Sequence, residues 1–149
     1  MKTGVKVMDA MTKSPIIVNS SISIKECCKI MLKEGVGGII VKDKNGIGII
    51  TEKDIIEKVV AKNLDPEKTT AKRIMTKNMV IISPDKDIYD AIIKMRDKDV
   101  RRLPVIYNGE LVGLLTEKDI LKIEPSLFDL LIERYEIREQ DKKPIKNRY

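Results

Sequence analysis

The sequence predicts an α+β fold made of two copies of one unit, packed with pseudo-twofold symmetry, and one further C-terminal helix. The phrase GIITEKD at 48–54 recurs as GLLTEKD at 113–119, and Met11-Thr12-Lys13 recurs as Met75-Thr76-Lys77. The first pair is offset by 65 residues and the second by 64, so one residue has been added in the loop between the matched blocks. Within each copy, short apolar runs that are typical of strands alternate with segments in which apolar residues recur every three or four positions, as in an amphipathic helix. The expected boundaries are copy one at 1–62, a linker at 63–70, copy two at 71–124, and the terminal helix with a basic tail at 125–149.

Local signals give copy one the order strand, helix, hairpin, helix. Capping residues mark where helices begin, glycine marks where the first one ends, and an Asn-Gly pair is typical of a tight hairpin turn. The predicted elements are a strand at Pro15–Val18, a helix from the cap Ser23 to Gly35, strands at Ile39–Val41 and Ile47–Ile50 turning at Asn45-Gly46, and a helix that begins at Thr51.

Copy two repeats this order. Its predicted elements are a strand at Val80–Ile82, a helix capped by Asp87, strands at Leu103–Tyr107 and Leu111–Leu115 turning at Asn108-Gly109, and a helix capped by Thr116.

The segment after Pro125 has no counterpart in copy one. Ser126-x-x-Asp129 has the spacing of a capping box, and apolar residues from Leu127 to Tyr135 crowd one side of a helix. We expect this helix to pack on its own module or across a dimer, with docking to another protein as the alternative. A basic tail follows, with Lys142, Lys143, Lys146 and Arg148.

The composition argues against an enzyme. The chain of 149 residues has no histidine, the commonest general base, and its two cysteines, Cys27 and Cys28, are adjacent within a helical pattern, where buried core thiols are expected. The net charge of +6 favours polyanions only loosely, because acidic and basic residues are interspersed. No apolar run reaches membrane length and the N-terminus has no apolar leader region, so we expect a cytoplasmic protein without membrane contact. The abundance of Lys, Glu and Ile is typical of a heat-loving source.

The repeated Thr-x-x-Asp has two interpretations. It is a capping box, which satisfies backbone N–H groups at a helix start. It also places a carboxylate with two acceptor oxygens at a helix N-terminus, which suits a ribose cis-diol and a neighbouring phosphate. The residues alone leave both roles open.

The motifs MTKSPIIV, GVGGIIV and GIITEKD in copy one, with VRRLPV in copy two, resemble the cystathionine-beta-synthase (CBS) domain family over about residues 7 to 124. The chain is identified as a tandem CBS pair, or Bateman module, of the archaeal stand-alone type. The resemblance implies a regulatory module with clefts between the copies for adenosine-containing ligands: AMP, ADP, ATP, or S-adenosylmethionine and methylthioadenosine. The aspartate of each motif would bind the ribose hydroxyls.

By that resemblance, the candidate ligand-binding residues form two sets, one for each copy. The first set is Thr12, Ser14, Ile16, Val36, Gly37, Thr51 and Asp54. The second set is Thr76, Asn78, Val80, Val100, Thr116 and Asp119.

The copies differ before the hairpin, where copy two has Arg101 and Arg102 and copy one has Gly37 and Gly38. In similar domains a basic residue here reaches the neighbouring site's phosphates, and guanidinium groups suit phosphate. We therefore expect the Thr51/Asp54 site to prefer a phosphorylated adenosine. Copy one departs from the family pattern at Gly38 and at Ile40, where proline is common, which affects the shape of its pocket.

The sequence thus predicts a non-enzymatic, homodimeric sensor in which an adenosine derivative alters docking to an unknown partner protein. The alternatives are a structural dimerisation module without a ligand, and a basic nucleic-acid-binding protein on a CBS scaffold. The latter has little support, because only the terminal Tyr149 accompanies the lysines of the tail.

Overall fold

The computed structural model describes residues 2–141, and these divide into two compact units. The copy-one unit consists of Pro15–Met79, and the copy-two unit consists of residues 2–14 together with 80–141. The sequence repeat and the packing therefore divide the chain at different places. The Met-Thr-Lys segment of each copy packs with the other copy's hairpin, and the linker around Pro66 belongs to the copy-one unit. Lys142, Lys143, Lys146, Arg148 and Tyr149 lie outside the described residues.

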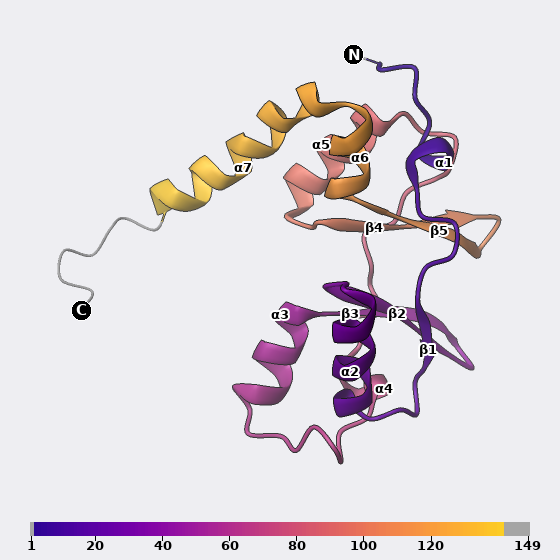
Figure 1. Ribbon diagram of the computed structural model, residues 1–149, viewed down its shortest axis with the longest axis vertical. Coiled ribbons are helices and arrows are strands. Elements are labelled where there is room, and N and C mark those ends of the chain that lie inside the picture. The colour runs from indigo at the N-terminus through magenta and orange to yellow at the C-terminus, as the bar shows by residue number, and fades with distance from the viewer. Residues whose placement is uncertain (1, 142–149) are drawn as a thin grey trace. The chain divides into compact units, whose positions relative to one another are not determined.

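The copy-one unit is a three-stranded sheet with its helices on one face (Figure 1). The sheet order is β1-β2-β3, with β1 parallel to β2 and β2 antiparallel to β3. Its elements are β1 (Ile17–Asn19), α2 (Ile24–Glu34), β2 (Gly38–Asp43), β3 (Gly46–Thr51), α3 (Glu52–Ile55), the π-helical turn η1 (Ile56–Val60) and α4 (Ala71–Ile74).

Helix α2 forms as the sequence predicts. The Ser23 hydroxyl accepts a hydrogen bond from the Glu26 backbone N–H at 3.1 Å, and Gly35 ends the helix in the left-handed conformation with φ of 65°. The apolar stripe of α2, which includes Cys27 and Met31, is buried in the core of the unit.

The hairpin of copy one turns one residue earlier than predicted. Asp43 pairs with Gly46, so Lys44 and Asn45 form the loop, and the Asp43 carboxylate accepts from the Asn45 backbone N–H at 2.7 Å. This side-chain contact stabilises the earlier turn and moves Gly46 to the start of β3.

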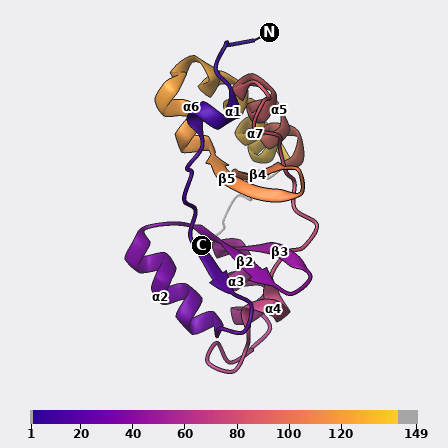
Figure 2. The ribbon, with the colours of Figure 1, turned by 90° about the vertical axis from the view of Figure 1, so that its right-hand side faces the viewer.

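The copy-two unit has a two-stranded antiparallel sheet and more helices (Figure 2). Its elements are α1 (Val7–Ala10), α5 (Ile88–Lys98), β4 (Arg102–Tyr107), β5 (Glu110–Thr116), α6 (Glu117–Ile123), the 3-10 turn η2 (Pro125–Leu127) and α7 (Phe128–Asp141). The short α1 packs against α5, α6 and β5, and its Val7 is fully buried.

The residue added to copy two lies in a strand. Val105 pairs with Gly113 and Ile106 with Leu111, so Val112 is an extra residue in a β-bulge of β5. The expectation that the insertion lies in a loop is therefore wrong. The turn at Asn108-Gly109 is confirmed: both residues have positive φ, 49° and 78°, as a tight hairpin requires.

The predicted strand at Val80–Ile82 is absent. Only Ile82 forms a bridge, a parallel one to Val105. An apolar run signals burial more reliably than it signals strand pairing, and Ile82 is indeed buried in the core of this unit.

Helix α7 packs on α5 of its own unit, as the sequence led us to expect (Figure 1). Leu127 and Leu131 are buried in the copy-two core, and Arg96 pairs with Glu133 at 3.1 Å. The predicted capping box at Ser126 is wrong, because Ser126 lies inside η2 and its hydroxyl donates to the Glu124 carboxylate at 2.6 Å.

Candidate functional site

The capping box of copy one is complete. The Thr51 hydroxyl accepts from the Asp54 backbone N–H at 3.4 Å, and Asp54 Oδ2 accepts from the Thr51 backbone N–H at 2.9 Å. These reciprocal bonds fix the turn from β3 into α3. Because the cap uses Oδ2 alone, it leaves Oδ1 of Asp54 for another contact.

The capping box of copy two has the same construction. The Thr116 hydroxyl accepts from the Asp119 N–H at 3.2 Å, and Asp119 Oδ2 accepts from the Thr116 N–H at 3.0 Å. The residue after each threonine also makes an equivalent backbone hydrogen bond. The Glu52 N–H donates to the Gly37 carbonyl at 3.1 Å, and the Glu117 N–H donates to the Arg101 carbonyl at 3.0 Å. The capping role of both motifs is therefore confirmed.

A threonine from a distant segment is bridged to the hairpin of each site. Thr76 forms a bridge with Ile49, exchanging two backbone hydrogen bonds of 3.0 and 2.9 Å, and its hydroxyl lies 3.5 Å from Asp54 Oδ1. In the same way Thr12 exchanges two backbone bonds with Leu114, two residues before Thr116. We call Thr51, Asp54 and Thr76 the copy-one site, and Thr116, Asp119 and Thr12 the copy-two site.

The two units group the residues of the two predicted sets differently from the sequence prediction. The copy-one unit contains Ile16, Val36, Gly37, Thr51 and Asp54 of the first set, together with Thr76 and Asn78 of the second. The copy-two unit contains Thr12 and Ser14 of the first set, together with Val80, Val100, Thr116 and Asp119. The Met-Thr-Lys segments have changed places, because each one pairs with the hairpin of the other copy.

Glycine in the repeated phrase has a steric reason. A Cβ on Gly48 would lie 3.0 Å from the Thr76 carbonyl oxygen and from the Met75 side chain. A Cβ on Gly113 would lie 2.9 Å from the Thr12 carbonyl oxygen and 2.5 Å from Met11 Sδ. Both glycines therefore allow the exchanged segment to approach the hairpin backbone.

The remaining predicted residues are placed by backbone pairing and by packing. Ile16 accepts a backbone bond from Ile40 and Val36 donates one to Met31, both at 3.0 Å. Val80 and Val100 pack against the copy-two core, and Arg102 pairs with Thr116 across β4 and β5. Ser14, Asn78 and Arg101 are exposed. Because Gly37 and Arg101 belong to different units, the hypothesis that arginine serves the Thr51/Asp54 site stays a prediction.

Lys58 is a site residue that the sequence reasoning missed. Its Nζ pairs with Asp54 Oδ1 at 3.0 Å and donates to the Ile74 carbonyl and the Thr76 hydroxyl at 3.0 and 3.1 Å. A lysine four residues after an aspartate on a helix favours an ion pair, so the sequence could have predicted this contact. In copy two the corresponding residue is Ile123, which is 43% exposed.

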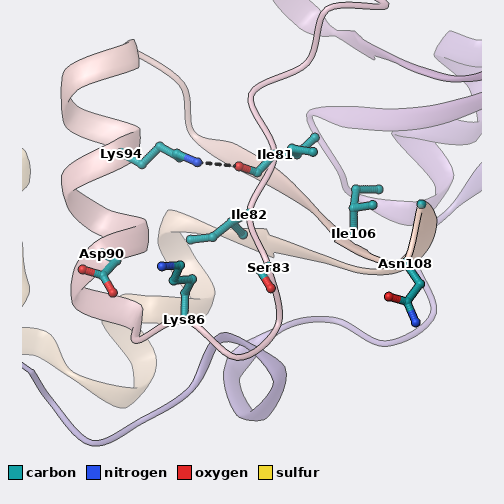
Figure 3. A pocket seen from close by; sticks show the side chains of 9 residues that line it. Ile81, Ile82, Ser83, Lys86, Asp90, Lys94, Ile106 and Asn108 are labelled. Carbon is teal, nitrogen blue, oxygen red and sulfur yellow. Dashed lines mark hydrogen bonds between the residues drawn. The ribbon is translucent and has the colours of Figure 1, made fainter.

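A groove of about 560 Å³ lies elsewhere in the copy-two unit (Figure 3). Its lining includes Lys86, Asp90 and Lys94, and the Lys94 ammonium donates to the Ile81 carbonyl at 2.8 Å. None of the predicted site residues lines it. Its one acidic and two basic side chains give it no single charge preference, so it does not compete with the capping boxes as a ligand site.

The cysteines are in the positions expected of core residues. Cys27 is fully buried and Cys28 is partly buried. Burial, and to a smaller extent the neighbouring Cys28, raise the pKa of Cys27 to about 11, and burial also raises the pKa of Cys28. Within residues 2–141, no group of three or more Cys, Asp or Glu side chains is placed to hold a metal ion. In the same part of the chain, none of the helices is both long enough and apolar enough to span a membrane.

Comparison with known proteins gives the relationships of the whole chain. The CBS domain family matches residues 7–61 and 71–126. An uncharacterized protein of Methanopyrus kandleri is 35% identical over 122 residues, which cover 80% of this chain and 60% of that protein. The chain thus corresponds to less than two thirds of this relative.

Solved structures include two informative neighbours. A CBS domain protein of Thermoplasma acidophilum is 25% identical with a TM-score of 0.78, covering 88% of this chain and 76% of that one. The CBS domain pair of protein MJ0100, solved with 5′-methylthioadenosine and S-adenosyl-L-methionine, is 32% identical with a TM-score of 0.72, covering 82% and 97%. With two matched segments in tandem, a mixed α+β fold and these neighbours, the chain belongs to the CBS domain family.

Proposed function

We propose that this chain is a regulatory module that binds an adenosine-containing ligand at a carboxylate of its Thr-x-x-Asp motifs. CBS domain pairs are regulatory modules, and the MJ0100 pair, which was solved with two adenosyl ligands, supports the ligand class. The observation that carries the proposal is the geometry of Asp119. Its Oδ2 completes the helix cap, and within the described part of the chain its Oδ1 has no hydrogen-bond or ion-pair partner.

A carboxylate on a partly buried residue such as Asp119 suits a ribose. Adjacent ribose hydroxyls are two donors, and a carboxylate has lone pairs on both oxygens to accept them. The cap holds the Asp119 carboxylate in one orientation, so little side-chain entropy is lost when the ligand binds. The ligand class that fits is a nucleoside with a free cis-diol, either phosphorylated, as in AMP, ADP and ATP, or alkylated, as in S-adenosylmethionine and methylthioadenosine.

Regulation follows if binding changes how a second protein docks. A ligand shifts a conformational equilibrium only by its difference in affinity for the two states. A ribose bound to Asp119 would favour the state in which β5 and α6 keep their present arrangement, since the Thr116–Asp119 turn joins these two elements. The regulated protein is unidentified, and we propose no catalytic role for this chain.

A homodimer and a cytoplasmic location stay predictions. Part of the apolar side of α7 is used within its own unit, where Leu131 is buried, while Phe128 is 49% exposed. In the copy-one unit Leu32, Ile56 and Val60 are exposed at 83%, 62% and 66%. Apolar side chains as exposed as these suit contact with a second copy. Light scattering on the purified chain measures the mass directly.

Thermal unfolding with a ligand panel tests the proposed function. We expect AMP, ATP, S-adenosylmethionine or methylthioadenosine to raise the melting temperature, since a ligand at about 100 times its Kd adds about 2.7 kcal/mol. Asp119→Ala should remove the shift, while Asp97→Ala, which changes an exposed carboxylate of α5, should keep it. No shift with any of the four ligands would contradict the proposal and favour a structural dimerisation module, and steeply salt-dependent retention on nucleic acid would favour the third alternative.

A further inference from the structure

The Lys58 ammonium has a full set of acceptors at the copy-one site. An ammonium carries three N–H donors. The structure provides three acceptors for them: Asp54 Oδ1 at 3.0 Å, the Ile74 carbonyl at 3.0 Å and the Thr76 hydroxyl at 3.1 Å. The Asp54 side chain is 14% exposed and that of Lys58 40%, so the charged contact lies at the edge of the unit with the carboxylate mostly covered.

Lys58 contacts Asp54 Oδ1, the carboxylate oxygen that takes no part in the helix cap. Oδ2 accepts from the Thr51 backbone and hydroxyl, and Oδ1 accepts from Lys58 with Thr76 at 3.5 Å. The carboxylate of copy one is therefore satisfied by protein groups on both oxygens. A ribose that approached Asp54 would have to displace a charge-assisted hydrogen bond.

The local backbone also differs between the copies. Lys58 lies in the π-helical turn η1, where the Ala61 N–H donates to the Ile56 carbonyl five residues earlier at 2.9 Å. In copy two the α-helix α6 continues without a π-helical turn to its last residue, Ile123, which stands in place of Lys58, and the 3-10 turn η2 begins at Pro125. An isoleucine side chain has no donor, so it cannot occupy Asp119 Oδ1.

We propose that Lys58 closes the copy-one carboxylate against adenosine ligands, so that each chain binds one ligand, at Asp119. This inference rests on the proposed function and adds to it which copy binds and which residue prevents the other from binding. It replaces the sequence-based expectation that the Thr51/Asp54 site prefers a phosphorylated adenosine. Because the ligand must replace a hydrogen bond to a charged group, its affinity for the copy-one site is lower by about 10- to 100-fold. The two copies then have different tasks: copy two responds to the ligand, and copy one is held in one state by its own lysine.

Exchange of the two side chains tests the proposal. Isothermal titration with AMP and with methylthioadenosine as probes should give one equivalent per wild-type chain, lost in Asp119→Ala and retained in Asp54→Ala. Lys58→Ile, which gives copy one the side chain of copy two, should bind two equivalents, and the added Asp54→Ala should remove the second. Ile123→Lys should weaken wild-type binding about tenfold or more, since the carbonyl of Ala10 and the hydroxyl of Thr12 correspond in sequence to the acceptors of copy one.

A matched control separates the contact from the charge. Lys53→Ile removes one positive charge from an exposed lysine of α3 and should leave one equivalent. Circular dichroism and urea unfolding check that each variant is folded, and Lys58→Gln provides a polar replacement if Lys58→Ile does not fold. Two equivalents of similar affinity in the wild type would overturn the role of Lys58 and leave the proposed function intact. Weaker AMP binding in Lys58→Ile would also overturn it and assign Lys58 to the phosphate. No binding of either probe to the wild type or to Lys58→Ile would overturn both proposals.

Discussion

The copy-one and copy-two sites share their backbone framework and differ in one side chain. Both have a threonine and an aspartate in a complete capping box, a glycine before them, and a threonine segment bridged to the hairpin. Copy one adds Lys58, which takes the second carboxylate oxygen, where copy two has Ile123. The duplication thus preserves what the fold needs, and in our proposal the fourth residue after the aspartate sets whether the carboxylate accepts a ligand.

The largest expected difference between the copies is a loss of stability when the contact of α7 with the copy-two core is removed. Leu131→Ala should lower the free energy of unfolding by about 2–5 kcal/mol, because the deleted side chain is 1% exposed and leaves a cavity against α5. Urea unfolding followed by circular dichroism measures the change. Leu32→Ala in copy one is the control, and at 83% exposure it should change stability by less than about 0.5 kcal/mol. A similar loss in the two variants would show that α7 does not stabilise the unit.

The glycines should show a smaller difference. Gly113→Ala should destabilise the chain by about 1–3 kcal/mol, because the new Cβ would meet the Thr12 carbonyl at 2.9 Å and Met11 Sδ at 2.5 Å. Gly48→Ala should cost less, since its closest contacts are all at 3.0 Å. Adding Met11→Ala to Gly113→Ala removes the sulfur contact only, so stability should recover in part after allowing for the Met11→Ala single variant. Equal or absent effects in differential scanning calorimetry would contradict the close approach of the exchanged segment.

The helix caps of α2 and α5 should respond differently to acid. Asp87 caps α5, and the corresponding cap of α2 is Ser23, which does not titrate in this range. Burial raises the pKa of Asp87, but hydrogen bonds from the Tyr89 backbone, the Thr3 hydroxyl and the Thr3 and Gly4 backbones outweigh it and lower the pKa to about 2.

The sign of the acid effect follows from this lowered pKa. The Asp87 contribution is present above the unfolded pKa of about 3.9 and is lost as the pH falls through the folded pKa. Urea unfolding between pH 5 and pH 2 should therefore show a steeper loss in the wild type than in Asp87→Ser, which gives copy two the cap of copy one. At neutral pH, Asp87→Ala should cost about 0.5–2 kcal/mol. Parallel pH profiles of the wild type and Asp87→Ser would contradict the lowered pKa.

The smallest effect concerns the two thiols of α2, which copy two replaces by Ala91 and Ile92. Because the pKa values of Cys27 and Cys28 are raised, the reactive thiolate is scarce at pH 8. We expect slow labelling by a disulfide reagent in the folded chain, with Cys28 reacting before the fully buried Cys27, and fast labelling of both in urea. Peptide mapping of single Cys→Ala variants assigns the order, and faster labelling of Cys27 would contradict its burial.

The sequence by itself determined the helix caps and the turn that depend only on residues close to one another along the chain. Ser23, Asp87, Thr51 and Thr116 cap their helices, because a cap needs only a side chain within a few residues of the orphan N–H groups. Asn108-Gly109 turns the second hairpin for the same local reason. The CBS family and its tandem repeat could likewise be predicted, since the motifs and their offset are properties of the linear chain.

The tertiary structure alone decided which segments meet. Thr76 lies beside Asp54 and Thr12 pairs with Leu114, although each threonine belongs by sequence to the other copy. Local patterns carry no information on which of two similar hairpin edges a segment joins, because that choice depends on the path of the linker and on packing over more than 20 residues. The position of the added residue as a bulge at Val112, and the three acceptors that surround Lys58, follow from the same long-range packing.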